Sequence, residues 1–254
     1  MTKARPLALV TGGWRRIGAA IARKLAVEGW DLALHAHHVG TCDPAFAAEL
    51  RDLGVEVHKL VGDLDDPDFA AGLVSAAKAA AGRAPTLLVN CASVFHDDTI
   101  ATLTADALAH HFRVNLFAPL LLTRAFADAL GDGEGCVVHI LDQRVVNPVP
   151  DQLSYTLSKQ ALHASVRTLA RALAPRVRVN GVAPGLTLPT DDYDADQWRR
   201  LEALMPLQRL SAPDEIAAAV HYLATARTVT GQTIFVDSGA NLESFARDFV
   251  YLAK

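Results

Sequence analysis

Short apolar runs alternate with longer segments of helical periodicity along the whole chain. The runs are apolar at consecutive positions, which is typical of strands buried on both faces of a parallel sheet. We predict strands at Leu7–Val10, Asp31–His35, Val55–Leu60, Thr86–Asn90, Cys136–Leu141, Val177–Val182 and Thr233–Val236. We predict helices at Ile17–Glu28, Pro67–Ala81, Ala105–Ala129, Leu153–Leu173 and Pro213–Ala224. This order favours one doubly wound α/β domain over residues 1–254, with a mostly parallel seven-stranded sheet.

Two segments depart from this alternation. Residues 186–205 are rich in Asp, Thr and Pro, and we interpret them as a mobile lid over a substrate. The polar and proline positions that mark the lid are Pro189, Asp191, Asp192, Asp194 and Asp196. The tail from Phe245 to Leu252 carries aromatic and aliphatic side chains that would be costly to leave in water. We therefore expect the tail to pack on a neighbouring subunit or over a pocket.

Composition narrows the possible partners. The chain has 254 residues, 51% of them hydrophobic, and a net charge of -4 without a block of Lys and Arg, so nothing favours nucleic acid or an anionic membrane. Cys42, Cys91 and Cys136 form no C-x-x-C pair, which predicts neither a disulfide framework nor a metal site and suits a reducing cytosol. We expect no signal peptide and no membrane span. A small-molecule substrate fits best.

A glycine-bearing turn joins the first predicted strand to the first predicted helix. It reads Thr11-Gly12-Gly13-Trp14-Arg15-Arg16-Ile17-Gly18. A strand, such a turn and a helix N-terminus together present backbone N–H groups and a positive dipole end to an anion. The pattern predicts a pyrophosphate site and a Rossmann-type domain, although Arg16 holds the position usually taken by the middle glycine.

The end of the second predicted strand bears on the choice of nicotinamide cofactor. An acidic residue there would bind the ribose 2′-hydroxyl of NAD. The sequence instead has His35, His37 and His38, and Arg15 lies in the preceding turn. Neutral or basic groups suit a 2′-phosphate, so we predict NADP, bound as NADPH, with NAD as the alternative. The histidines are equally well explained as exposed polar residues at a strand end.

Tyr155 and Lys159 lie four residues apart in the predicted helix Leu153–Leu173, so their side chains share one face. A free phenol has a pKa of about 10, and we expect the nearby ammonium group to lower the pKa of Tyr155. Asp142 precedes Tyr155 by thirteen residues and adds a carboxyl group. The three groups predict a proton relay.

These motifs resemble the short-chain dehydrogenase/reductase family over nearly the whole chain. The resemblance rests on Thr11-Gly12 with Gly18, Asp63, Asn90-Cys91-Ala92-Ser93, Asn115, Tyr155 with Lys159, and Pro184-Gly185. It implies that Asp63 and Leu64 contact the adenine, that Asn90 and Ala92 line the cofactor groove, and that Pro184 and Gly185 border the nicotinamide. The predicted cofactor-binding residues are then Gly12, Arg15, Arg16, Ile17, Gly18, His35, His37, His38, Asp63, Leu64, Asn90, Ala92, Ser93, Tyr155, Lys159, Pro184 and Gly185.

The same resemblance implies two further roles and an assembly. Lys159 would bind the nicotinamide ribose, and Asn115 would hold a water molecule in the proton path. A cytoplasmic homotetramer is expected, with one interface at the helices Ala105–Ala129 and Leu153–Leu173 and another in the C-terminal region.

Asp142 stands where most members of that family have a serine that donates a hydrogen bond to a substrate carbonyl. The sequence is most similar to the pteridine reductase branch, which includes dihydromonapterin reductases and has an aspartate at this place. Arg16, Ser93, Phe95 and Asp142 match that branch one by one. Phe95 is expected to stack on a flat pterin ring, with core packing as the alternative. The predicted substrate-binding residues are Arg16, Ser93, Phe95, Asp142, Tyr155, Leu186 and Leu188.

The predicted activity is NADPH-dependent reduction of a C=N bond of a pterin, with Asp142, Tyr155, Lys159 and Asn115 as the catalytic residues. An ionised carboxylate cannot donate to a ketone oxygen, whereas a carboxyl group made less acidic by desolvation can pass a proton to a ring nitrogen. One alternative is a carbonyl reductase acting on a sugar, a 3-oxoacyl thioester or a steroid-like ketone. The other is a non-catalytic NADP-binding sensor, which the intact relay residues disfavour.

Overall fold

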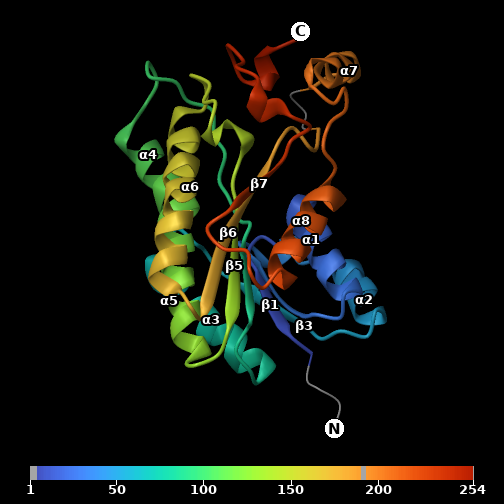
Figure 1. Cartoon of the computed structure of the whole chain (residues 1–254), viewed down its shortest axis with the longest axis vertical. Coiled ribbons are helices and arrows are strands. Elements are labelled where there is room, and N and C mark those ends of the chain that lie inside the picture. The colour runs from blue at the N-terminus through green and yellow to red at the C-terminus, as the bar shows by residue number, and fades with distance from the viewer. Residues whose placement is uncertain (1–4, 190–192, 254) are drawn as a thin grey trace.

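A single parallel sheet runs through the molecule. The computed structural model describes residues 5–189 and 193–253 (Figure 1). The strand order is β3-β2-β1-β4-β5-β6-β7, and each pairing among these strands is parallel. The strands are β1 (Leu7–Val10), β2 (Asp31–Ala36), β3 (Val57–Val61), β4 (Leu87–Asn90), β5 (Gly135–Ile140), β6 (Val177–Pro184) and β7 (Thr233–Val236). The predicted doubly wound, seven-stranded fold is therefore confirmed.

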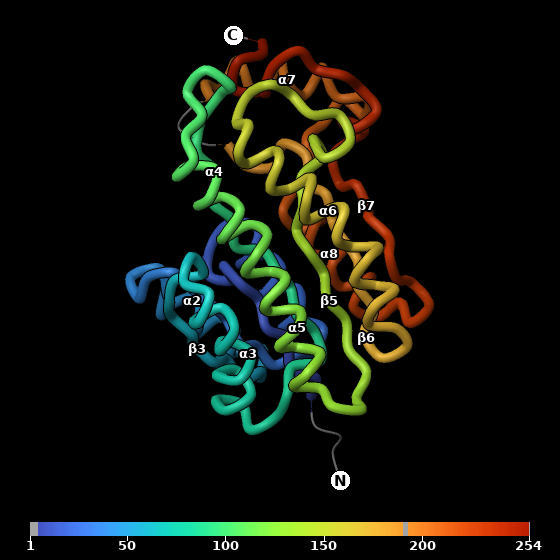
Figure 2. Tube along the Cα trace, turned by 90° about the vertical axis from the view of Figure 1, so that its left-hand side faces the viewer, coloured from blue at the N-terminus to red at the C-terminus, as the bar shows by residue number. Residues whose placement is uncertain are grey.

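Helices cover both faces of this sheet. They are α1 (Arg16–Val27), α2 (Pro44–Asp52), α3 (Pro67–Ala81), α4 (Ala105–Phe112), α5 (Ala118–Leu130), α6 (Leu153–Leu173), α7 (Ala195–Leu204) and α8 (Pro213–Thr225). One apolar core joins α1, α2 and α8 to the sheet, and a second joins α3, α5 and α6 to the opposite face (Figures 1 and 2). No helix in residues 5–189 or 193–253 is long and apolar enough to cross a membrane.

Most of the predicted elements are present, with small shifts at their ends. β1 and β7 have the predicted bounds, and the other strands differ by one or two residues at one end or at both. α2 was not predicted, although its start carries a clear signal. Asp43 caps the helix by accepting a hydrogen bond from the N–H of Ala45 at 2.9 Å, and Pro44 occupies the first helical position.

The prediction of one continuous helix over Ala105–Ala129 is wrong. The chain forms α4, then a wider π-helical turn at Arg113–Phe117, then α5. Pro119 has no N–H, so the Asn115 carbonyl lacks the donor that an α-helix would supply four residues later. Such turns are frequent at functional sites, and this one holds Asn115.

The carboxyl ends of all seven strands meet at one edge because the sheet is parallel. Ligands of doubly wound proteins bind at this edge. The glycine turn follows β1, the Asn90-Cys91-Ala92-Ser93 loop follows β4, Asp142 follows β5, and Gly185 follows β6. The fold thus brings the predicted motifs, which are far apart in sequence, to one place.

Candidate active site

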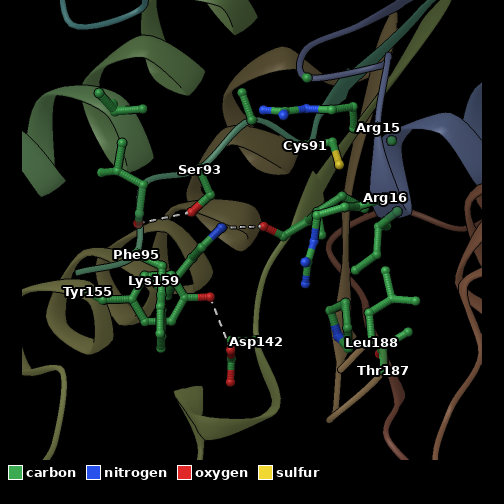
Figure 3. Close-up of a pocket in the computed structure, with 18 of the residues that line it drawn as sticks. Arg15, Arg16, Cys91, Ser93, Phe95, Asp142, Tyr155, Lys159, Thr187 and Leu188 are labelled. Carbon is green, nitrogen blue, oxygen red and sulfur yellow. Dashed lines mark hydrogen bonds between the residues drawn. The ribbon is translucent and has the colours of Figure 1, made fainter. Parts of the chain in front are cut away.

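A cavity of about 800 Å³ opens at the carboxyl edge of the sheet (Figure 3). The predicted residues in its wall are Gly12, Arg15, Arg16, Ile17, Gly18, His35, His37, Asp63, Leu64, Ala92, Ser93, Phe95, Asp142, Tyr155, Lys159, Pro184, Gly185, Leu186 and Leu188. Tyr155 and Asp142 lie on one side of it, across from Arg16, Thr187 and Leu188 (Figure 3). The volume lies within the range of small-molecule sites.

Three predicted residues lie outside the cavity wall. Asn90 is buried in the sheet, where its amide nitrogen lies 3.1 Å from the Nδ1 of His139, so it supports the groove from behind. Asn115 is fully buried in the π-helical turn. His38 is exposed beside the ring of His37, with a centroid separation of 3.8 Å.

The glycine turn is shaped by close backbone contacts. Gly12 has a φ of +64°, which favours glycine. A Cβ at Gly18 would overlap the carbonyl oxygen of Gly12, so only glycine lets α1 begin this close to the turn. Arg16 has a φ of 53°, the left-handed conformation that the usual middle glycine would adopt without strain. The turn therefore keeps the backbone shape of a phosphate site while placing a guanidinium group in the cavity wall.

Replacing Gly18 with alanine is expected to weaken NADPH binding by more than about tenfold, because the first turn of α1 must move and, with it, the backbone N–H groups that we expect to bind the pyrophosphate. Gly72→Ala is the matched control. Gly72 lies in α3 with open space around it, and alanine there should stabilise the fold by about 0.5–1 kcal/mol. Fluorescence titration with NADPH and thermal unfolding of both variants make the comparison. Normal NADPH affinity in Gly18→Ala would contradict this account of the turn.

The histidines at the end of β2 have different environments. The Nδ1 of His35 accepts a hydrogen bond from the N–H of Gly12 at 3.4 Å, and its Nε2 lies 3.0 Å from the Gly62 carbonyl oxygen. Burial lowers the pKa of His35, so this ring is neutral and braces the turn. His37 lies 3.4 Å from the carboxylate of Asp63 and is half exposed. Arg15 and His37 both line the cavity in this region, as do Arg16 and the neutral His35.

The carboxyl group and the phenol meet as predicted. The Tyr155 hydroxyl donates a hydrogen bond to Asp142 Oδ2 at 3.0 Å (Figure 3). The ring of Phe95 stands edge to face with that of Tyr155, at a centroid separation of 4.7 Å and an angle of 79°. Phe95 is 48% exposed, so core packing does not account for it. The predicted proton-transfer groups and the partly exposed ring of Phe95 therefore line the same part of the cavity.

The predicted lowering of the Tyr155 pKa is wrong. Burial and the facing Asp142 carboxylate raise the pKa of Tyr155 well above its ordinary value. The Lys159 ammonium group lies over the Tyr155 ring, 5.7 Å from its centroid, but its hydrogen bond goes from Nζ to the carbonyl oxygen of Ile140 at 2.8 Å. Burial lowers the pKa of Lys159 to about 8. The phenol is consequently protonated at neutral pH and can act as a donor.

The N-terminus of α6 is held by a loop from elsewhere in the chain. Asp98 accepts from both the N–H (at 3.0 Å) and the hydroxyl of Ser154, whereas the preceding Gln152 has a φ of 46° and makes no capping bond. Asp98 follows Phe95 in the loop after β4. The start of α6, which carries Tyr155, is thereby fixed to the loop that carries Phe95.

Asn115 connects the same loop to α6. Its Oδ1 accepts from the N–H of Val94 (2.9 Å) and the hydroxyl of Ser93 (3.0 Å). Its Nδ2 donates to the Val94 carbonyl oxygen and to Ser158 Oγ, both at 3.0 Å. The side-chain amide is thus fully engaged within the protein.

Arg144 was missed by sequence reasoning. It is 5% exposed, lines the cavity and donates from Nε to Asp142 Oδ1 at 3.1 Å. The C-terminal tail also reaches the cavity through Asp248, Phe249 and Val250, which agrees with the expectation that it packs over a pocket. Two features of the sequence could have indicated this role of Arg144. Arg144 follows Asp142 by two residues, and the acidic Asp248 lies within an otherwise apolar tail.

The predicted lid is partly helical. Leu186, Thr187 and Leu188 lie in the cavity wall, and the segment continues into α7. Asp194 caps α7 by accepting from the N–H of Gln197 at 2.6 Å. Asp191 and Asp192 lie outside the described residues. The mobility of this segment stays a prediction.

Comparison with known proteins agrees with this geometry. The model of a family described as enoyl-(acyl carrier protein) reductase matches residues 13–241. Pteridine reductase 1 of Leishmania tarentolae is 29% identical over 280 residues, covering 93% of this chain and 96% of that protein.

Solved structures are also similar. FolM alternative dihydrofolate reductase 1 from Brucella canis, complexed with NADP, is 41% identical with a TM-score of 0.86, covering 94% of this chain and 95% of that one. A 3-oxoacyl-[acyl-carrier protein] reductase from Brucella melitensis is 30% identical with a TM-score of 0.85, covering 96% and 100%. The chain belongs to the short-chain dehydrogenase/reductase family and resembles its pteridine reductase branch.

Proposed function

We propose that this protein is an NADPH-dependent reductase of a C=N bond in a pterin, such as a dihydropterin or dihydrofolate-type substrate. The observation that carries the proposal is the hydrogen bond from the Tyr155 hydroxyl to Asp142, beside the exposed ring of Phe95. A ketone reductase would need a hydrogen-bond donor where Asp142 stands, and a carboxylate is only an acceptor. The likeness to pteridine reductase 1 and to FolM supports the same substrate class.

The residues present fit an NADPH molecule. Gly12 and Gly18 lie in the cavity wall at the N-terminus of α1, where backbone N–H groups would bind a pyrophosphate. Arg15 and His37 line the cavity and would bind a 2′-phosphate, and Lys159 and Gly185 line the part where the nicotinamide end would bind. The bound cofactor would supply the hydride. The NADP complex of the FolM protein supports this choice over NAD.

Phe95 and Arg16 suit a flat ring rich in nitrogen. Phe95 presents an exposed aromatic surface, and Arg16 lies across the cavity from Tyr155 (Figure 3). A stacked ring gains about 0.5–1.5 kcal/mol beyond burial. Arg16 can hold the ring edge and a cofactor phosphate together, which explains an arginine at a strained backbone position.

Asp142 and Tyr155 would supply the proton. When hydride adds to the carbon of C=N, the π electron pair moves to nitrogen, which must gain a proton. Tyr155 keeps its proton at neutral pH because its pKa is raised. Asp142 accepts that proton and delivers it to the ring nitrogen. A water molecule replenishing Tyr155 would bind the main chain of the π-helical turn, since the Asn115 side chain is already engaged.

A substrate panel tests the proposal. NADPH consumption is followed with dihydrobiopterin, dihydromonapterin, dihydrofolate and several ketones, including a 3-oxoacyl thioester. Turnover of a dihydropterin with little ketone reduction is expected. The likeness to a 3-oxoacyl reductase makes ketone reduction the second candidate, and ketone turnover without pterin turnover would replace our proposal. Tight NADPH binding without any turnover would favour a sensor.

Burial of the Lys159 ammonium group lowers the stability of the folded protein at neutral pH. The pKa of Lys159 is about 8 in the folded protein and 10.5 in the unfolded chain. Below pH 8, folding buries a charged ammonium group. Between pH 8 and 10.5, the unfolded state binds more protons than the folded state. Wild-type stability should therefore rise across that window. Lys159→Met should be more stable than the wild type at pH 7 by about 1–3 kcal/mol. This advantage should disappear by pH 10.5 in urea unfolding, and an advantage that does not change with pH would refute the assignment.

From the same resemblance we also propose a homotetramer in the cytoplasm. Phe117 and Leu157, on the helical layer that includes α5 and α6, are 49% and 39% exposed and are candidates for a covered interface. Light scattering coupled to gel filtration would measure the assembly.

A further inference from the structure

A buried guanidinium group connects Asp142 to the C-terminal tail. Arg144 donates from Nε to Asp142 Oδ1 at 3.1 Å, from Nη1 to Gln152 Oε1 at 3.1 Å and from Nη2 to Asp248 Oδ2 at 2.6 Å. Its main-chain N–H donates to the same Asp142 oxygen at 2.9 Å. Both carboxylate partners are largely buried, and an arginine fork fixes partners in direction as well as distance.

The tail that supplies Asp248 is itself anchored. Asp151 accepts from the N–H of Asp248 at 2.8 Å and pairs with Arg247. Gln197 of α7 is 1% exposed and donates to the carbonyl oxygens of Val250 (3.0 Å) and Leu252 (2.8 Å). Figures 1 and 2 show the tail beside α7 at the end of the molecule where β5 and β6 finish. Asp248 is therefore held in place from two sides.

Arg144 also faces the reactive rings. Its Cζ lies 5.4 Å from the Tyr155 ring centroid and 5.7 Å from that of Phe95. The charged groups around the phenol are Asp142, Asp248, Arg144 and Lys159. When all four side chains are ionised, two carry a negative charge and two a positive charge, so their net charge is zero.

We propose that Arg144 and Asp248 are positioning residues for proton donation, in which the tail carboxylate fixes the guanidinium and the guanidinium fixes Asp142. With Oδ1 held by Arg144, Oδ2 is directed at the Tyr155 hydroxyl. The inference rests on the proposed function in one respect, namely that Tyr155 and Asp142 carry out the proton transfer. It deepens that function by assigning the C-terminal tail a part in the chemistry.

The two residues should have opposite electrostatic effects on Tyr155. The Asp142 and Asp248 carboxylates raise the pKa of Tyr155, whereas the Arg144 guanidinium lowers it. Removing Asp248 should release the phenol proton at lower pH, and removing Arg144 should retain it to higher pH. These opposite shifts test the charges around the phenol, and a loss of kcat at unchanged KM and NADPH affinity tests the positioning role.

The experiment measures kcat, KM and NADPH affinity across pH for Asp248→Asn, Arg144→Met and Arg144→Lys. Arg247→Gln is the control, because it loosens the same tail without touching Arg144. Circular dichroism and thermal unfolding check that each variant folds, and the double variant Arg144→Met/Asp248→Asn leaves no unpaired charge at the tail. We expect Arg144→Met to lose about 10–100-fold in kcat, with KM and NADPH affinity within about threefold.

The direction of the pH shifts decides the outcome. Asp248→Asn should move the alkaline limb of kcat to lower pH, Arg144→Met should move it to higher pH, and Arg144→Lys should recover part of the lost kcat. An Asp248→Asn profile identical to that of Arg247→Gln, or an unchanged kcat in Arg144→Met, would overturn the inference. If the panel above shows that ketones are the substrates, the proposed function fails, but the same variants still test this inference because Tyr155 remains the proton donor.

Discussion

Tyr155→Phe is expected to lower kcat with a dihydropterin by about 10²–10⁴-fold, the usual contribution of a positioned proton donor. The phenol is protonated and hydrogen bonded to Asp142 in the resting protein, so the substitution removes the proton while keeping the ring that packs against Phe95. NADPH affinity should stay within about twofold because the hydroxyl is used only during proton transfer. Steady-state rates and fluorescence titration measure the two quantities.

Tyr222→Phe provides the matched control. Tyr222 lies on α8 and is 53% exposed, so loss of its hydroxyl should change neither rate nor affinity. Unchanged turnover in Tyr155→Phe would remove this residue from the proton path. Loss of NADPH binding in parallel with kcat would instead indicate a disturbed pocket.

Asp142→Asn is expected to have the next largest effect, a loss of about 10²–10³-fold in kcat with dihydropterins. The amide has a single acceptor oxygen, so it can accept from Tyr155 or from Arg144 but not from both, as the two carboxylate oxygens do, and it cannot carry a proton to the ring nitrogen. An amide N–H₂ can, however, donate to a carbonyl oxygen. The ratio of ketone turnover to pterin turnover should therefore increase, and the substrate panel measures it directly.

Asp31→Asn separates this effect from the general loss of a buried acid. Asp31 is 4% exposed and pairs with Arg83 at the opposite end of β2 from the cavity. Its substitution should lower the thermal midpoint without a change in substrate preference. Should Asp142→Asn reduce NADPH binding as strongly as kcat, the carboxylate would have a cofactor role and the relay would be refuted.

Local patterns sufficed for the strands and for four of the eight helices of the described residues, α1, α3, α6 and α8, because buried strands are continuous apolar runs and these helices have a clear apolar period. They failed where one residue changes the backbone. Pro119 removes a donor and converts one predicted helix into α4, a π-helical turn and α5. The short helix α2 was not predicted because its nine residues give too few turns for a clear apolar period, although Asp43 and Pro44 mark its start.

The residues of the candidate site likewise fall into those that the sequence could predict and those that it could not. Residues in motifs, such as Tyr155 and Asp142, could be placed from spacing alone because they follow β5 and open α6. Arg144 could not, since its partner Asp248 is 104 residues away and only the fold brings them together. The predicted direction of the shift in the Tyr155 pKa was wrong for a related reason. Sequence spacing suggested Lys159 as the neighbour, but its ammonium group is turned toward Ile140, and burial dominates.

The left-handed backbone at Arg16 restricts what a mutational library could recover there. Side chains branched at Cβ are strongly disfavoured at a φ of 53°, so valine, isoleucine and threonine should be depleted among folded clones. Glycine, asparagine and aspartate tolerate the conformation best, yet none carries a guanidinium group. Selection for folding and selection for turnover should therefore enrich different amino acids at this one codon.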